Sequence, residues 1–266
     1  MNLLEKIVKA KRADIEMMKE KFPVASLERR IYFTAETLSL ERSLENSSNH
    51  GIIAEFKRQS PSRGVINEGA LPEDVCPRYL RSGAAAVSIL TDSEFFGGSN
   101  DDLTRARKSC NAPILRKDFI ISEYQVLESK SIGADAILLI ADILSEKELK
   151  SLSRLAESLK MEVLFEIHEE NGIRKLPGNA RLTGINSRNL GNFSIDMSIL
   201  NETLSKLPDN AIGIAESGIH SAETLIELES LGFKGFLIGE LFMKEKDPGE
   251  AFNRFITNIN KNKSAK

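Results

Sequence analysis

Short β-branched apolar runs alternate with amphipathic segments of helical length from about residue 50 onward. Apolar runs bounded by polar segments are typical of buried strands, and the longer amphipathic segments are typical of helices. Several of these longer segments begin with serine, which can cap a helix, and end at glycine, which can terminate one. The predicted strands are eight in number and cover residues 52–56, 86–90, 114–117, 136–140, 162–167, 182–185, 212–215 and 235–238.

Strict alternation of strands and helices predicts parallel strands joined by crossover helices. Eight such units in about 215 residues match the requirement of a closed (β/α)8 barrel. An open, doubly wound sheet is the alternative. It is disfavoured because no G-x-G-x-x-G motif follows the first strand, and because charged residues end many strands instead of lining one crevice. We therefore predict an α/β fold made of a single (β/α)8 TIM barrel.

The regions outside the alternating pattern predict the domain organisation. Residues 1–50 contain two or three helical stretches, which we expect to form an N-terminal extension packed on the barrel and covering part of its mouth. The barrel is predicted to span residues 51–260, and residues 261–266 to form a basic tail. The first stretch is a charged amphipathic helix instead of a signal peptide, because no long uncharged apolar core follows its first basic residues.

Composition narrows the classes of function. Net charge is −3, which gives no sign of a nucleic-acid partner. No apolar run approaches the roughly 18 residues needed to span a bilayer. Cys76 and Cys110 are isolated and the three histidines lie far apart, so we expect neither disulfides nor a Cys/His metal site. The features predict a cytoplasmic, reduced protein without a metal, in contact with neither membrane nor nucleic acid.

Charged residues occupy the C-terminal ends of several predicted strands. Glu55 and Lys57 share one face of the first strand, because strand side chains alternate between faces. Lys117, Glu166 and Glu216 take inward positions on three other strands. Any one of them could be a solvated strand end or a satisfied ion pair. Burying an unpaired charge costs several kcal/mol, however, and barrel active sites lie at this end. Together the five residues predict a site that holds an anion and moves protons.

Two glycine-bearing turns follow the last two predicted strands, where barrels of this kind commonly bind phosphate. Gly218 and Gly239 allow backbone N–H groups to come close to an oxyanion, and Ser217 and Glu240 lie in the same turns. Ser60, in the loop after the first strand, can donate a further hydrogen bond. A plain strand-to-helix turn is the alternative for either glycine alone.

The loop after the sixth predicted strand is rich in polar groups. Asn186, Arg188 and Asn189 stand where a simple connection would not need them, and Asn186 can orient a hydroxyl or carbonyl group of a substrate. His168 shares the face of Glu166 but follows the end of its strand, so we interpret it as a solvated residue. The aromatic pair at 95–96 is a wall for a substrate ring, part of a lid or part of a helix-capping loop.

These stretches carry a family resemblance. The blocks IIAEFKRQSPSRG, SILTDSEFFGGSNDDL, PILRKDFIISEYQ, GADAILLI, FEIHEE, GINSRNL, AESGI and LIGELFM follow one another in the order seen in indole-3-glycerol-phosphate synthases. The resemblance covers roughly residues 50 to 245. Its K-x-x-S-P-S-x-G and R-K-D-F blocks are specific, whereas related tryptophan- or histidine-pathway barrels share only the phosphate loops.

The resemblance implies a reaction and a substrate. The substrate would be 1-(2-carboxyphenylamino)-1-deoxyribulose 5-phosphate, whose ring closure with loss of carbon dioxide and water gives indole-3-glycerol phosphate. No metal or organic cofactor is expected. Some family members are fused to a second barrel, and we expect a single activity here. A monomer or weak homo-oligomer acting on a phosphorylated small molecule is the expected form.

The resemblance also implies roles for individual residues. Lys117 resembles the general acid that protonates the substrate carbonyl, and Glu166 resembles the base that assists dehydration. Lys57 would hold the carboxylate or phosphate side of the substrate or take part in proton delivery, and which lysine acts at which step stays open. The remaining polar contacts would come from Glu55, Asn186, Glu216 and Ser217, with Gly218 and Gly239 at the phosphate.

The chemistry of the residues agrees with this assignment. A lysine whose pKa is lowered by burial and nearby positive charge, facing a carboxylate, can supply and remove protons near neutral pH. Two rival functions remain. One is a Schiff-base aldolase with Lys117 or Lys57 as nucleophile. The other is a non-catalytic barrel that binds phosphosugars, which would not need five inward charges.

Overall fold

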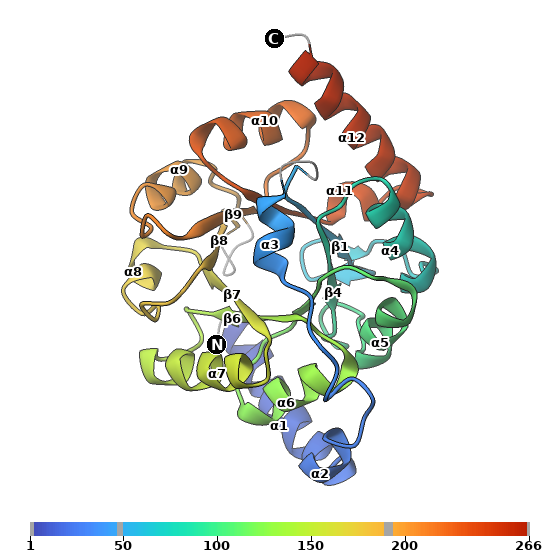
Figure 1. Cartoon of the computed structure of the whole chain (residues 1–266), viewed down its shortest axis with the longest axis vertical. Helices are drawn as coiled ribbons and strands as arrows, with labels where there is room; N and C mark the ends of the chain where they lie inside the picture. The colour runs from blue at the N-terminus through green and yellow to red at the C-terminus, as the bar shows by residue number, and fades with distance from the viewer. Residues whose placement is uncertain (1–2, 47–49, 189–193, 265–266) are drawn as a thin grey trace.

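The structure is a computed structural model that describes residues 3–46, 50–188 and 194–264. Eight parallel strands close into a barrel in the order β1-β10-β9-β8-β7-β6-β5-β4 (Figure 1), which confirms the predicted α/β TIM-barrel fold. Six strands have the predicted bounds, and β8 and β9 each run one residue further, to Asn186 and Glu216. The strands are β1 (Ile52–Phe56), β4 (Ala86–Leu90), β5 (Ile114–Lys117), β6 (Ala136–Ile140), β7 (Glu162–Ile167), β8 (Leu182–Asn186), β9 (Ile212–Glu216) and β10 (Gly235–Ile238).

Helices surround the barrel, and the predicted caps hold several of them in place. Ser122, Ser145 and Ser221 each accept a hydrogen bond from a backbone N–H in the first turn of the helix that follows. Gly133 and Gly232 end two helices in the left-handed conformation. The helices after β1 are α4 (Pro72–Arg81), α5 (Asn100–Ser109), α6 (Glu123–Ile132), α7 (Glu146–Ser158), α8 (Glu170–Ile173), α9 (Ser198–Leu204), α10 (Ala222–Leu231), α11 (Glu240–Met243) and α12 (Pro248–Ser264).

Each barrel strand divides its side chains between two apolar cores. Phe56 of β1 and Phe165 of β7 point outward into the layer between strands and helices. Ile53 of β1 and Leu164 of β7 point inward into the barrel. The alternation follows from the pleat of a strand, so residues two positions further along an inward row reach the C-terminal mouth. Glu55 and Glu166 hold such positions.

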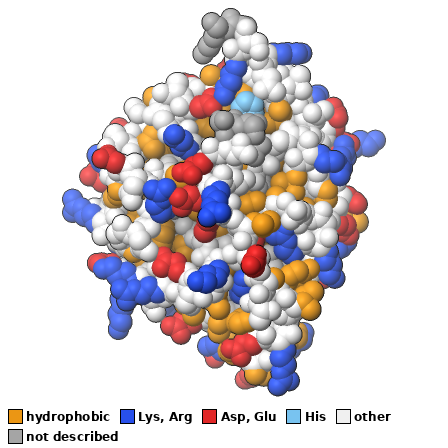
Figure 2. Space-filling view, in the orientation of Figure 1, with side chains coloured by type: hydrophobic (Ala, Val, Ile, Leu, Met, Phe, Trp, Pro, Cys, Tyr) orange, Lys and Arg blue, Asp and Glu red, His pale blue; other side chains and the backbone are white. Residues whose placement is uncertain are grey.

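The N-terminal extension contains α1 (Leu3–Lys21), α2 (Val24–Leu27) and α3 (Leu40–Glu45). Helix α3 lies across the N-terminal end of the barrel, which faces the viewer in Figure 1. Its Leu40 and Leu44 are buried with the inward residues, and Ser43 Oγ donates to the carbonyl of Ala85, 2.5 Å away. The face in Figure 2 carries interspersed acidic and basic side chains, in keeping with the near-neutral net charge.

Helix α1 is tied to the opposite end of the barrel by a buried lysine. Lys11 Nζ lies 2.7 Å from Asp92 Oδ2, after β4, and 2.9 Å from Asp118 Oδ1, after β5. The charges of the two aspartates outweigh the effect of burial and raise the pKa of Lys11 above its usual 10.5. Asp118 directly follows Lys117, so the extension helps to fix the end of the strand that carries this candidate acid.

Residues 261–264 differ from their predicted place in a basic tail. They form the last turn of α12, where Lys263 Nζ lies 2.6 Å from Glu229 Oε2 of α10. Ion pairing across two helices holds this basic segment on the barrel. Within the described part of the chain, no helix combines the length and the apolarity that crossing a bilayer requires.

Replacing Lys11 by Met should destabilise the protein. The variant removes the Lys11 ammonium from buried Asp92 and Asp118 and leaves only Arg116 paired with Asp118. We expect this to lower the free energy of unfolding by about 3–5 kcal/mol. Lys9→Met is the matched control, because Lys9 is exposed on the same helix and should change stability by no more than about 0.5 kcal/mol. Urea denaturation measures both. Equal stabilities for the two variants would contradict the structural role of Lys11.

Candidate active site

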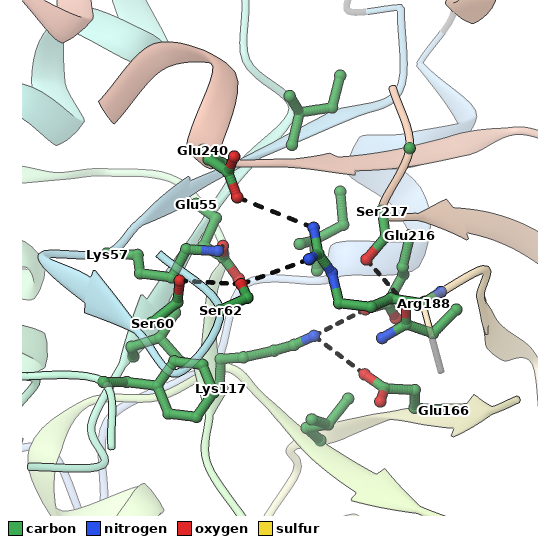
Figure 3. A pocket seen from close by; sticks show the side chains of 18 of the residues that line it. Glu55, Lys57, Ser60, Ser62, Lys117, Glu166, Arg188, Glu216, Ser217 and Glu240 are labelled. Carbon is green, nitrogen blue, oxygen red and sulfur yellow. Dashed lines mark hydrogen bonds and ion pairs between the residues drawn. The ribbon is translucent and has the colours of Figure 1, made fainter. Parts of the chain in front are cut away.

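One pocket at the C-terminal mouth of the barrel gathers the predicted site residues (Figure 3). They come from the ends of β1, β5, β7, β8, β9 and β10, which are far apart in sequence. Asn189, predicted in the same region, lies outside the described residues. The predicted residues that line the pocket are Glu55, Lys57, Ser60, Lys117, Glu166, Asn186, Arg188, Glu216, Ser217, Gly218, Gly239 and Glu240.

Lys117 lies between two buried carboxylates. Its Nζ is 3.0 Å from Glu166 Oε2 and 2.7 Å from Glu216 Oε2, as the dashed lines in Figure 3 show. The side chain of Lys117 is 12% exposed, whereas those of Glu166 and Glu216 are 3% and 1% exposed. One ammonium group therefore links strands β5, β7 and β9, and the three side chains that meet there are largely buried.

The three groups shift one another's pKa values. Burial opposes ionisation of Glu166, but the charges of Lys117 and His168 outweigh it and lower the pKa of Glu166 to about 2. Burial and the negative charge of Glu166 raise the pKa of Glu216 to about 8, although Lys117 acts in the opposite direction. At neutral pH the site thus holds an ionised Glu166 beside a protonated Glu216.

The expectation that the pKa of Lys117 is lowered is wrong. Burial does disfavour the ammonium form, but the negative charges of Glu166 and Glu55, together with the hydrogen bond to Glu216, raise the pKa of Lys117 above its usual 10.5. The sequence argument assumed that nearby positive charge would dominate. The surrounding charges are carboxylates, so Lys117 stays protonated and can act as a proton donor at neutral pH.

Two glycines make room for these carboxylates. A Cβ at Gly184 of β8 would lie 2.1 Å from Glu216 Oε1, and a Cβ at Gly239 would lie 2.5 Å from Glu55 Oε2. Glu55 Oε2 also accepts a hydrogen bond from Lys57 Nζ at 2.5 Å, so the two charged residues of β1 form a pair along the rim. Gly239 is therefore needed for the packing of Glu55 as well as for the predicted approach to an oxyanion.

The turn after β9 has an unusual backbone. Ser217 has a φ of 67°, a value that is uncommon outside glycine and costs conformational energy. Its Oγ donates to Asn186 Oδ1 at 2.8 Å, and the same oxygen of Asn186 accepts the N–H of Arg188 at 3.0 Å. Asn186 thereby joins the two loops that follow β8 and β9 and fixes the strained turn.

Glu240 holds two arginines above the pocket. Its Oε1 lies 2.9 Å from Arg63 Nε, and its Oε2 lies 3.8 Å from a terminal nitrogen of Arg188. Arg188 also donates to Ser62 Oγ at 3.4 Å, and Ser62 Oγ lies 3.3 Å from Ser60 Oγ. The carboxylate of Glu240 thus faces basic side chains from two other loops.

The side of the pocket next to β4–β6 is apolar. Sequence reasoning identified part of it, since the aromatic pair at 95–96, one of the candidate ring walls, contributes Phe96. It missed the aliphatic residues, whose inward positions are also those of ordinary core residues. The apolar lining here comes from Leu90, Phe96, Phe119, Leu138 and Ile140.

The interpretation of His168 as a solvated residue is wrong. Its side chain is only 10% exposed. Nδ1 lies 2.8 Å from Asp142 Oδ2, and Nε2 lies 3.4 Å from Glu166 Oε1. Burial lowers its pKa, but the hydrogen bond to Asp142 and the charge of Glu166 outweigh burial and raise the pKa above 6.5. The inward periodicity of β7 continues one step past the strand, and that signal pointed to burial.

Protonation of Glu216 should make stability depend on pH. Between pH 4.5 and about 8 the folded protein keeps a proton on Glu216 that the unfolded chain has lost, so stability should fall as pH rises through this window. In Glu216→Gln this contribution disappears. Melting temperatures at pH 5.5 and 8.5 should therefore differ more for the wild type than for the variant. Glu227→Gln, on an exposed position of α10, is the control. An identical pH dependence for all three proteins would refute the buried proton.

Comparison with known proteins places the chain in a family. The family model described as indole-3-glycerol phosphate synthase matches residues 4–255. A protein of that name from Bacteroides thetaiotaomicron is 43% identical over 258 residues, covering 97% of this chain and 99% of that protein. One from Campylobacter jejuni is 41% identical over 259 residues, covering 96% and 100%.

Solved structures support the fold at much lower sequence identity. A 3-hexulose-6-phosphate synthase from Salmonella typhimurium has a TM-score of 0.59 at 12% identity, covering 79% of this chain and 99% of that one. A chain of the tryptophan synthase complex from Pyrococcus furiosus has a TM-score of 0.58 at 11% identity, covering 80% and 99%. These likenesses concern the barrel alone. The family match and the relatives decide the identity: the chain belongs to the indole-3-glycerol phosphate synthase family, whose members are lyases of tryptophan biosynthesis.

Proposed function

We propose that the chain forms indole-3-glycerol phosphate by general acid–base catalysis, with Lys117 as the acid and Glu166 as the base. The observation that carries the proposal is the pairing of an ammonium group with an ionised carboxylate 3.0 Å away in a buried site. The protonated Glu216 leaves this pair without an excess negative charge. The reaction needs a protonated donor for the carbonyl oxygen during ring closure. It also needs an ionised acceptor for the proton that leaves carbon during dehydration.

The two-sided pocket suits 1-(2-carboxyphenylamino)-1-deoxyribulose 5-phosphate. The apolar wall with Phe96 and Phe119 accommodates the aryl ring. The turns at Gly218 and Gly239, on the opposite rim, accommodate the phosphate through backbone N–H groups. Lys117 stands between these two sides, where the ketone of the extended substrate would lie. This placement supports the orientation with the phosphate at β9 and β10 and the ring at β4–β6.

The reaction would then proceed in two stages. In the first, the aryl carbon that bears the carboxylate attacks the ketone, Lys117 protonates the carbonyl oxygen, and loss of carbon dioxide restores aromaticity. In the second, the new hydroxyl leaves as water after protonation, while Glu166 removes a proton from the neighbouring carbon. Lys57, Arg188 and Ser60 supply donors that can hold the substrate carboxylate before it is lost.

The environment of Lys117 argues against the aldolase alternative. A Schiff-base lysine needs a neutral amine, which burial near other cations favours. The carboxylates around Lys117 instead hold it in the ammonium form. Lys57, the second candidate nucleophile, lies 2.5 Å from Glu55 Oε2, so it also faces a carboxylate.

The proposal extends to the setting of the enzyme. A phosphorylated pathway intermediate and free buried thiols at Cys76 and Cys110 fit a reducing cytoplasm. We propose that the enzyme acts as a monomer or a weak homo-oligomer. We propose residues 1–50 as an extension of the barrel domain and residues 51–260 as the catalytic barrel.

Substitution of the proposed acid or base should abolish most activity. Lys117→Ala and Glu166→Gln should each lower kcat by roughly 10²–10⁴-fold, because each removes a proton-transfer group. Appearance of indole fluorescence from the carboxyphenylamino ribulose phosphate measures the rate, and circular dichroism checks the fold. Glu169→Gln is the control, since Glu169 is exposed just beyond β7 and should leave kcat unchanged. Wild-type turnover in either active-site variant would remove that residue from the mechanism.

Borohydride separates the proposal from the aldolase. With the substrate or a ketose phosphate present, reduction should leave the protein mass unchanged, because no imine forms at an ammonium group. Mass spectrometry of the intact protein detects any adduct. A covalent adduct at Lys117 or Lys57 would favour nucleophilic catalysis instead.

A further inference from the structure

We propose that Glu240 is an exchangeable counter-ion of Arg188. An oxyanion of the ligand displaces Glu240 from Arg188 when the ligand binds, and Glu240 takes Arg188 back once that oxyanion has left the site. The inference rests on the proposed function and deepens it, because it concerns how the same pocket takes up and releases its anion. The oxyanion is either the phosphate or the carboxylate of the substrate, and binding measurements with each kind of anion separate the two.

Glu240 places a negative charge where the ligand is also negative. Its side chain lines the pocket, and it directly follows Gly239, whose turn we propose for the phosphate. Like charges brought together at a binding site lower the affinity unless cations neutralise one of them. A neutral residue would therefore serve tight binding better, so the carboxylate calls for a role other than affinity.

The side chain of Arg188 is held only by long contacts. One terminal nitrogen lies 3.8 Å from Glu240 Oε2, beyond hydrogen-bond distance, and the other donates to Ser62 Oγ at 3.4 Å (Figure 3). A guanidinium has five N–H donors, and its strong contacts with oxyanions measure about 2.7–2.9 Å. Among the described residues Arg188 thus meets no partner that occupies its donors fully, and these donors lie at the mouth of the pocket.

Glu240 keeps a second cation when Arg188 leaves it. Glu240 Oε1 lies 2.9 Å from Arg63 Nε, in the loop after β1. The side chain of Glu240 is also 21% exposed, so water reaches its carboxylate. Arg188 can therefore turn to a ligand without leaving an unpaired charge behind it.

The two anions compete for one guanidinium. A long, partly exposed ion pair is weak, and an oxyanion held by two N–H groups of the guanidinium is a stronger partner. The oxyanion departs as carbon dioxide if it is the carboxylate, and with the product if it is the phosphate. Glu240 is then the acceptor that remains, and its competition lowers the affinity for the anion and speeds its release.

Binding of simple anions to the wild type and to Glu240→Gln tests the exchange. Calorimetric titration with inorganic phosphate and, separately, with 2-aminobenzoate at constant ionic strength gives the dissociation constants. We expect Glu240→Gln to bind at least one of the two about three- to tenfold more tightly, because an uncharged amide competes poorly for Arg188. The anion that gains is the one that Arg188 takes.

Direct repulsion of the ligand by Glu240 is the alternative, and a second background separates it from the exchange. In Arg188→Met the gain from Glu240→Gln should vanish, because no guanidinium is left to release, whereas repulsion would preserve the gain. Arg188→Gln is the second background if Arg188→Met does not fold. Glu202→Gln removes one negative charge at an exposed position of α9 and should change neither dissociation constant.

Unchanged or weaker binding of both anions in Glu240→Gln would overturn the exchange, and so would a gain that persists without Arg188. These titrations require no turnover, so either result leaves the proposed function intact. That function instead fails if Lys117→Ala and Glu166→Gln are fully active.

Discussion

The active site depends on one ammonium group shared by two carboxylates. Lys117 reaches Glu166 and Glu216 from a third strand, and all three ionisable side chains are largely buried. Isolated, each would be too costly to bury. Together they become tolerable because Glu216 keeps a proton and leaves a neutral pair of acid and base. The arrangement that permits burial is the same one that sets the protonation states for the chemistry.

The surrounding structure holds Lys117 and the neighbouring carboxylates in position. Gly184 leaves space for Glu216, and Gly239 leaves space for Glu55, because a side chain at either glycine would collide with the carboxylate. The residue after Lys117, Asp118, is held from both sides, by Arg116 on β5 and by Lys11 on the N-terminal extension. The extension thus acts on the same strand end as the catalytic lysine, which links its packing to the geometry of the site.

The sequence predicted the charged residues of the site because side chains along a strand point alternately to its two faces. Glu55, Lys117, Glu166 and Glu216 interrupt apolar inward rows, and such interruptions have few structural explanations. Properties that depend on distance between segments could not be read in this way. The sign of the pKa shift of Lys117 depends on carboxylates from β7 and β9, and the burial of His168 depends on Asp142 from a different loop. The helical end of α12 likewise depends on its contact with α10, because a basic composition alone is equally compatible with a tail.

The central claim is that Glu216 carries a proton while Glu166 is ionised. Difference infrared spectroscopy between the wild type and Glu216→Gln at pH 7 tests it most directly, with Glu166→Gln as the reference. The account predicts that the first substitution removes a protonated carboxylic acid band and that the second removes carboxylate bands. Loss of carboxylate bands in Glu216→Gln, without loss of an acid band, would contradict it.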